Sequence, residues 1–276
     1  MCYYCAMNDT IEKHLDSLRT SGYSLSSVRA RRRVLATLPD ALNMDREAVQ
    51  SWWASREMYL PGGGDARVRA LASRSGEASH CREFWRWCMQ QGIIDRNPAD
   101  WLPKVRKTKT KTVYVPEADM YRLMREAPNR MRLMLALGAM AGLRSSEIGS
   151  ITWEDIDRAN GVMWVRGGKG GQDRSVPLSG GLLAELGDPT VGIIVGATMT
   201  GKAVSIAISR YMRSHDVNLT AHKLRARYAT RFLAATGDAI ATAEVLGHSD
   251  LSSVMRYAVA SSDTMRKGAE ACGRIG

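Results

Sequence analysis

The sequence has few cysteines and no long hydrophobic run. Its five cysteines among 276 residues are odd in number and lack the spacing of a disulfide framework, which excludes a small disulfide-stapled secreted fold and favours a reducing compartment. No apolar stretch approaches the roughly 20 residues that span a bilayer. The first ten residues also lack the charged and apolar regions of a secretory signal. We therefore expect no membrane contact and a cytoplasmic location.

Patterns that ligate metals are equally scarce. Cys2 and Cys5 form a single CxxC without a second pair of ligands, so incidental cysteines are favoured over a zinc site. No cluster of acidic residues is suited to magnesium. We therefore expect neither a metal nor another cofactor.

Positive charge is in excess. The formal net charge of +11 predicts an acidic partner. Five of the eight residues from 104 to 111 are basic, and the stretch is either a solvated linker or a segment that lies along a phosphate backbone. The candidate DNA contacts in this stretch are Lys107, Lys109 and Lys111. A second set is Arg29, Arg31, Arg32 and Arg33, although an arginine-rich face is often only solvated.

Apolar spacing predicts helices over most of the chain. Helical periodicity covers the first hundred residues, with breaks at Gly22, Pro39, the glycines after Pro61, and Gly92. It resumes from residue 116 to 140 and again after Pro177. Short strands are predicted at about 151–157, 162–166 and 174–178. The fold class is therefore mainly α with one small antiparallel sheet.

The length favours two domains. We place a helical domain at residues 1–103, a basic linker at 104–112 and a second, α-rich domain at 113–276.

Side chains that can hold and cleave a phosphodiester gather in the second half of the chain. The frames are AGLRSSEIGSITWEDID around Arg144, RGGKGGQDRSVPL around Lys169, TAHKLRARYATRF around His222 and Arg225, and LGHSDLSSVMRYAV around His248 and Tyr257. Arginines offer permanently charged, bidentate donors to non-bridging phosphate oxygens. Lysine and histidine can move protons, and a tyrosine can attack the phosphorus. Taken singly, each residue is more often an ordinary ion pair, cap or surface group.

In this order, the four frames resemble the tyrosine recombinase family of phage integrases and Xer-type recombinases, over about the last 160 residues. CREFWRWCMQQGIIDRNPADWL, at 81–102, resembles the last helix and exit of the family's core-binding domain. The resemblance implies an N-terminal helical bundle that grips DNA core sites and a catalytic domain with a small sheet.

The resemblance also assigns roles to the candidate residues. Tyr257 attacks the scissile phosphate and forms a 3′-phosphotyrosyl link, while Arg144 and Arg225 clamp that phosphate. Lys169 protonates the departing 5′-oxygen. His222 and His248 complete the catalytic set, together with Tyr257. Glu147, on the helical face of Arg144, either orients the clamp or forms a surface salt bridge.

Family members act as homo-tetramers on double-stranded core-type DNA sites and exchange strands through a Holliday junction without ATP. We expect the same here, in a bacterial host. Because core-binding-like helices begin almost at the first residue, we expect no separate arm-binding domain, and any directionality factor is unidentified. The 19 residues after Tyr257 are long enough to reach a neighbouring protomer.

The sequence leaves two alternatives open. A monomeric type IB topoisomerase shares the chemistry, but the core-binding resemblance argues against it. A non-enzymatic basic DNA-binding protein accounts for the charge, yet leaves the ordered set of catalytic residue types unexplained.

Overall fold

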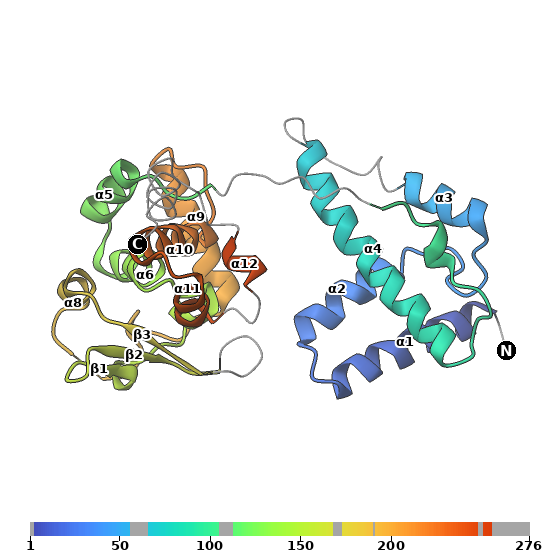
Figure 1. Ribbon diagram of the computed structural model, residues 1–276, viewed down its shortest axis with the longest axis horizontal. Coiled ribbons are helices and arrows are strands. Elements are labelled where there is room, and N and C mark those ends of the chain that lie inside the picture. Colours follow the sequence, from blue (N-terminus) through green and yellow to red (C-terminus); the bar gives the residue numbers. More distant parts are fainter. Residues whose placement is uncertain are drawn as a thin grey trace, which may run out of the picture. The chain divides into compact units, whose positions relative to one another are not determined.

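The computed structural model describes residues 3–55, 66–104, 113–167, 173–189, 191–247 and 251–255. The chain divides into two compact units, Met1–Lys109 and Thr110–Gly276, here called unit 1 and unit 2 (Figure 1). Each has its own hydrophobic core.

The described part of unit 1 is helical. Its elements are α1 (Tyr3–Thr20), α2 (Leu25–Leu35), α3 (Arg46–Ser55), α4 (Ala66–Gln90) and the 3-10 helix η1 (Pro98–Trp101). The break expected at Gly22 separates α1 from α2, and Ser24 caps α2 by accepting a hydrogen bond from the Ser27 backbone. The long helix α4 contacts α1, α2 and η1. Phe84 and Trp85 on α4 are fully buried.

An ion pair inside unit 1 joins α2 to α4. The Arg31 guanidinium lies 2.5 Å from a carboxylate oxygen of Glu83, and its carbon lies 4.5 Å from the centre of the Tyr23 ring. Arg31 is buried. The side chain therefore holds two helices together, through charge and through its planar face.

Unit 2 is built from short helices and one small sheet. Its elements are α5 (Glu117–Glu126), α6 (Asn129–Met140), α7 (Ser145–Ile148), η2 (Trp153–Asp155), β1 (Ile156–Asp157), β2 (Val162–Val165), β3 (Arg174–Pro177), α8 (Gly180–Leu186), α9 (Gly201–Ser214), α10 (His222–Thr236), α11 (Ala239–Leu246) and α12 (Ser252–Met255). The sheet is antiparallel in the order β1-β2-β3.

Helix α6 lies at the centre of unit 2. It contacts α5, α7, α8, α9 and α10, and the residues from Met134 to Ala139 are buried all round it (Figure 1). A helix that is apolar on every side belongs in a core rather than on a surface. The sheet meets the helices through β3, which contacts α11. This contact brings two distant parts of the sequence to the candidate site.

The first expected strand is shorter than the sequence indicates. Residues 153–155 form a 3-10 turn, and only Ile156–Asp157 pair with β2. The carboxylate of Asp155 accepts hydrogen bonds from both the backbone nitrogen and the hydroxyl of Thr152, at 3.0 and 2.9 Å. These two local hydrogen bonds close the turn and prevent an extended conformation.

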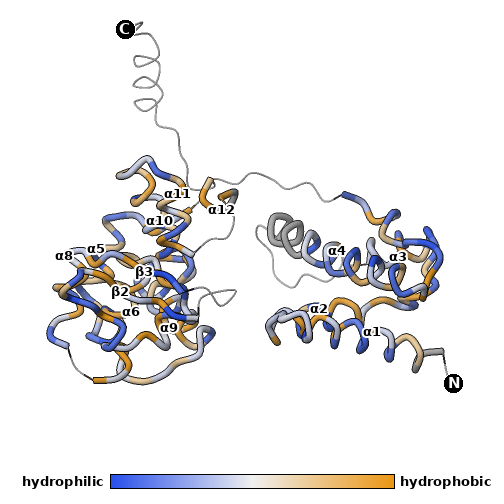
Figure 2. Tube along the Cα trace, turned by 60° about the horizontal axis from the view of Figure 1, so that its bottom comes forward, coloured by the Kyte–Doolittle hydropathy of each residue, from blue (hydrophilic) through white to orange (hydrophobic). Residues whose placement is uncertain are grey.

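In the described part of the chain, no helix is long and apolar enough to cross a membrane. Figure 2 shows hydrophilic and hydrophobic residues alternating in short stretches along α1, α4 and α10.

A buried histidine is the weak point of unit 1 in acid. The His14 side chain is 1% exposed, packs edge-on against Phe84 and near Trp87, and has no hydrogen-bond partner for either ring nitrogen among the described residues. Burial lowers the pKa of His14 to about 4; the charge of Glu83 opposes this shift and the charge of Arg31 adds to it, both with smaller effects. The folded protein therefore holds this imidazole neutral.

We predict that unit 1 loses stability as the pH falls, because the unfolded chain protonates His14 near pH 6.5 and the folded chain only near pH 4. The free energy of unfolding should drop by about 2 kcal/mol between pH 7.5 and pH 5. Hydrogen exchange of the α1 and α4 amides in the full chain measures this loss. His14→Leu should remove most of it, and an equal pH dependence in the variant would contradict the prediction.

Candidate functional site

Arg144 is placed by a tight turn between α6 and α7. Gly142 has a φ of +65°, and a Cβ there would lie 2.6 Å from a ring carbon of Tyr228. The chain then extends through Arg144, which is the residue before the first turn of α7. At the other end of α7, a Cβ on Gly149 would meet the Met199 carbonyl oxygen at 2.1 Å. Glycine at both positions lets α7 pack this closely.

Glu147 binds Arg144 in two ways. One carboxylate oxygen accepts the backbone N–H of Arg144 at 2.7 Å, and the other accepts a guanidinium N–H at 2.7 Å. The Glu147 side chain is only 7% exposed. Of the two interpretations of Glu147 from sequence, this geometry favours the orienting residue over the surface salt bridge.

A second arginine, which sequence reasoning missed, binds the same carboxylate. Arg174 on β3 donates Nη1 and Nη2 to the two oxygens of Glu147 at 2.9 and 2.8 Å. The signal was present in the sequence, since Arg174 and Val176 alternate with exposed residues and share the buried face of β3. A charged residue on the buried face of a strand indicates a buried partner.

Helix α10 carries His222 and Arg225 one turn apart. His222 is the first residue of the helix and is exposed, whereas the Arg225 side chain is 2% exposed. The Arg225 guanidinium donates to the Gly142 carbonyl at 2.6 Å and lies 3.9 Å from the Glu147 carboxylate. Glu147 thus joins the two arginines that the sequence predicted as a pair.

Three consecutive backbone carbonyls at the end of α11 each accept a hydrogen bond from a different arginine. Arg174 Nε donates to Val245 at 2.9 Å, Arg225 Nη2 donates to Leu246, and Arg144 Nη2 donates to Gly247 at 2.7 Å. The last carbonyls of a helix have no partner within it, and the negative end of the helix dipole attracts cations. The arginines therefore anchor the residues that directly precede His248.

The charge of this cluster is positive on balance. In the described part of the site, three guanidiniums surround the single carboxylate of Glu147. Burial raises the pKa of Glu147, but hydrogen bonds and charges from Arg174 and Arg144 outweigh burial and lower the pKa to about 2. The carboxylate is ionised at neutral pH, and the remaining positive charge suits a phosphodiester.

Two tyrosines of unit 2 are unsuited to nucleophilic attack. Burial raises the pKa of Tyr228 to about 12, against smaller opposing effects of Arg174 and Arg225. Burial also raises the pKa of Tyr211, whose hydroxyl donates to the Leu123 carbonyl at 3.0 Å. Both phenols pack in the protein and stay protonated at neutral pH.

Several predicted residues lie outside the described residues: Lys107, Lys109, Lys111, Lys169, His248 and Tyr257. For two of them, flanking parts of the chain are described: β2 and β3 flank the stretch that holds Lys169, and Gly247 directly precedes His248. Among the side chains that the structure describes, no three histidine, cysteine or acidic residues are grouped to hold a metal ion.

The arginines of α2 differ in their surroundings. Arg29, Arg32 and Arg33 are exposed, and Arg32 forms an ion pair with Glu12. Arg31, by contrast, is occupied by Glu83. The exposed members are the ones available to a partner.

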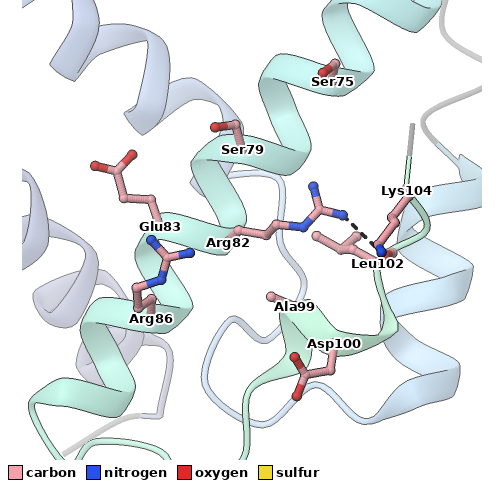
Figure 3. A pocket seen from close by; sticks show the side chains of 9 residues that line it. All are labelled: Ser75, Ser79, Arg82, Glu83, Arg86, Ala99, Asp100, Leu102 and Lys104. Atoms are coloured by element: carbon pink, nitrogen blue, oxygen red, sulfur yellow. Dashed lines mark hydrogen bonds between the residues drawn. The ribbon is translucent and has the colours of Figure 1, made fainter. Parts of the chain in front are cut away.

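A polar hollow of about 800 Å³ runs beside α4 in unit 1. Figure 3 shows Ser75, Ser79, Arg82 and Arg86 following one another along α4. Arg82 donates to the carbonyls of Leu102 and Pro103 at 3.3 and 3.2 Å, which ties the chain after η1 to this helix. Hydroxyls and guanidiniums in a groove are the groups that contact nucleic acid.

We predict that Glu147→Gln lowers the unfolding free energy of unit 2 by about 3–5 kcal/mol, because it leaves buried guanidiniums without their counter-ion. Chemical denaturation at pH 7 measures the loss. Glu185→Gln is the matched control, since it also removes a bidentate partner, that of Arg132, whose side chain is 41% exposed. There the loss should be about 1 kcal/mol or less. Equal losses in both variants would contradict the prediction.

Comparison with known proteins bears on the identity of this fold and site. Residues 114–263 match the Phage integrase family. The tyrosine recombinase XerC of Yersinia pestis is 31% identical over 227 residues, which cover 70% of this chain and 73% of that protein. The structure of a lambda integrase (75–356) dimer bound to a COC′ core site matches with a TM-score of 0.71 at 16% identity, over 91% of this chain and 94% of that one. A lambda integrase tetramer bound to a Holliday junction matches with a TM-score of 0.67 at 15% identity, over 88% of this chain and 77% of that one.

The structural matches confirm the mainly α fold with its small antiparallel sheet. The sequence matches favour a site-specific recombinase over a type IB topoisomerase or a non-enzymatic DNA-binding protein. The chain belongs to the phage integrase family and is a tyrosine recombinase.

Proposed function

We propose that this protein cleaves and rejoins DNA at specific sites through a covalent bond to Tyr257. The phenolic oxygen attacks the scissile phosphorus, the bond from phosphorus to the 5′-oxygen breaks, and a 5′-hydroxyl leaves with a proton. The product is a 3′-phosphotyrosyl link. Attack by a 5′-hydroxyl of another strand reverses the step and completes the exchange. Because the bond energy stays in the covalent intermediate, no nucleotide cofactor is consumed.

The grouping of Arg144 and Arg225 around Glu147 is the observation that carries this proposal. A phosphoryl transition state gathers negative charge on its non-bridging oxygens, and preorganised guanidiniums stabilise that charge without having to reorganise. The Arg144 side chain is 23% exposed, more than that of Arg225, and supplies the outer face of the clamp. Both arginines bind the end of α11, so the clamp lies beside the segment that continues to Tyr257.

Proton transfers are assigned to residues around the clamp. Lys169 follows β2 in a glycine-rich stretch, GGKGG, and protonates the departing 5′-oxygen. His222 stands one turn before Arg225 and is exposed. His248 directly follows the carbonyl that Arg144 binds. These histidines hydrogen-bond the phosphate or exchange protons with the reacting oxygens.

Unit 1 supplies the second half of the DNA grip in this proposal. The exposed Arg29 and Arg33 of α2, and the side of α4 that carries Ser79 and Arg86, contact core-type double-stranded DNA. Lys107, Lys109 and Lys111 contribute contacts to the phosphate backbone of the same DNA. Four copies act together on two sites in the cytoplasm of a bacterial host. The lambda integrase tetramer bound to a Holliday junction, which has the same fold, supports this assembly.

We predict that Tyr257→Phe abolishes covalent attachment to DNA and leaves binding within about twofold of the wild type, because the phenyl ring keeps its bulk and loses only the nucleophile. The assay is a nicked suicide duplex taken from DNA that flanks the protein's own gene, with denaturing electrophoresis for the adduct. Tyr121→Phe is the control, since Tyr121 is exposed on α5. Adduct formation by the Tyr257 variant would show that another residue attacks.

A second prediction concerns the α4 grip. Arg86→Gln should weaken DNA binding and reduce the slope of log affinity against log salt by about one, because one phosphate contact is lost. Fluorescence anisotropy at several salt concentrations measures the slope. Lys13→Gln is the charge-matched control, because Lys13 is exposed on α1 and pairs with Asp9. If both variants change the slope equally, net charge rather than this side of α4 sets the affinity.

A further inference from the structure

Arg174 uses every nitrogen of its guanidinium inside the protein. Nη1 and Nη2 bind the two oxygens of Glu147, and Nε binds the Val245 carbonyl. Its side chain is only 6% exposed. These three contacts all go to groups of the protein, so we infer the role of Arg174 from the segments that it joins.

The two partners of Arg174 lie in different parts of the proposed site: the phosphate clamp, and the end of α11 that precedes His248. Glu147 orients Arg144 and lies 3.9 Å from Arg225, so it belongs to the phosphate clamp. Val245 belongs to the end of α11, three residues before His248. The planar guanidinium of Arg174 therefore connects the phosphate clamp to the end of α11.

The fit between Arg174 and α11 is close. A Cβ on Gly247 would lie 3.1 Å from Cδ of Arg174, nearer than side chains normally approach. Gly247 also ends the helix with a φ of +61°. The position of the chain immediately before His248 is therefore set by contact with this arginine as well as by hydrogen bonds.

We propose that Arg174 is a positioning residue for strand cleavage, which fixes the end of α11 against the Arg144–Arg225 clamp so that the segment carrying His248 and Tyr257 starts from a defined place. This proposal rests on the proposed function. It requires a guanidinium, because three donors in one plane are needed and lysine presents a single ammonium. An error of about 1 Å in such an anchor is enough to slow a reaction about 100-fold.

The test compares Arg174→Lys and Arg174→Ala with Arg132→Lys in the full chain. Arg132 is a matched control, since it too binds a carboxylate with two nitrogens, that of Glu185, and donates a third to the Met124 carbonyl. DNA affinity and the single-turnover rate of adduct formation are measured separately on the nicked suicide duplex. Both Arg174 variants should cleave about 100-fold more slowly with affinity within about twofold, and Arg132→Lys should match the wild type.

Chemical rescue distinguishes positioning from general loss of folding. Methylguanidinium at millimolar concentration should restore part of the cleavage rate of Arg174→Ala, because it refills the vacated site, and methylammonium should not. Unchanged rates in both Arg174 variants would overturn the proposal. So would a slow rate that follows entirely from weaker DNA binding, or that both additives restore equally.

Hydrogen exchange tests the same proposal without DNA. The amides of Leu246 and Gly247 should exchange faster in Arg174→Lys, while those of α6 keep the wild-type rate. Protection equal to the wild type at α11 would overturn the positioning role even if cleavage is slow. Failure of the wild type itself to form an adduct would count against the proposed function, and the exchange result would still decide what Arg174 holds.

Discussion

One buried carboxylate, that of Glu147, holds the site together. It binds Arg144 and Arg174 directly and lies within 3.9 Å of Arg225, residues that three different elements bring in. Without it the three like charges would repel one another in a place where little water screens them. With it, the arginines keep fixed directions and still carry a surplus of positive charge. Contacts within the protein therefore fix these arginines without a ligand.

The same chemistry explains why net charge overstates the surface available to DNA. In unit 1, Arg31 is buried against Glu83 and Tyr23, and in unit 2 Arg174 is buried against Glu147. Both arginines connect elements that are distant in the sequence, and both use the planar guanidinium for several contacts at once. The basic composition thus serves internal architecture as well as binding. The salt dependence of DNA binding should therefore reflect only the exposed cationic side chains.

Much of the fold could be predicted from the sequence, because a helix depends on residues that are close together in the chain. Breaks at Gly22 and Gly92 and the apolar spacing between them set the helices of unit 1. The clustering of Arg144 with Glu147 also follows from a short spacing. The strand predicted at 151–157 is shorter in the structure, because the carboxylate of Asp155 closes a turn there. The alternation in β3 indicates that Arg174 has a buried partner, but the partners themselves could not be predicted, because they lie on α7 and α11, far away in the chain.

We expect Glu147 and Arg174 to act as one unit on cleavage, although neither is proposed to touch the phosphate. A double-mutant cycle tests it most directly, with single-turnover adduct formation measured for Glu147→Gln, Arg174→Lys and the double variant at a temperature where all are folded. If the two residues act together, the double variant should cleave about as slowly as the slower single variant. Losses that multiply in the double variant would show two independent contributions and contradict the account.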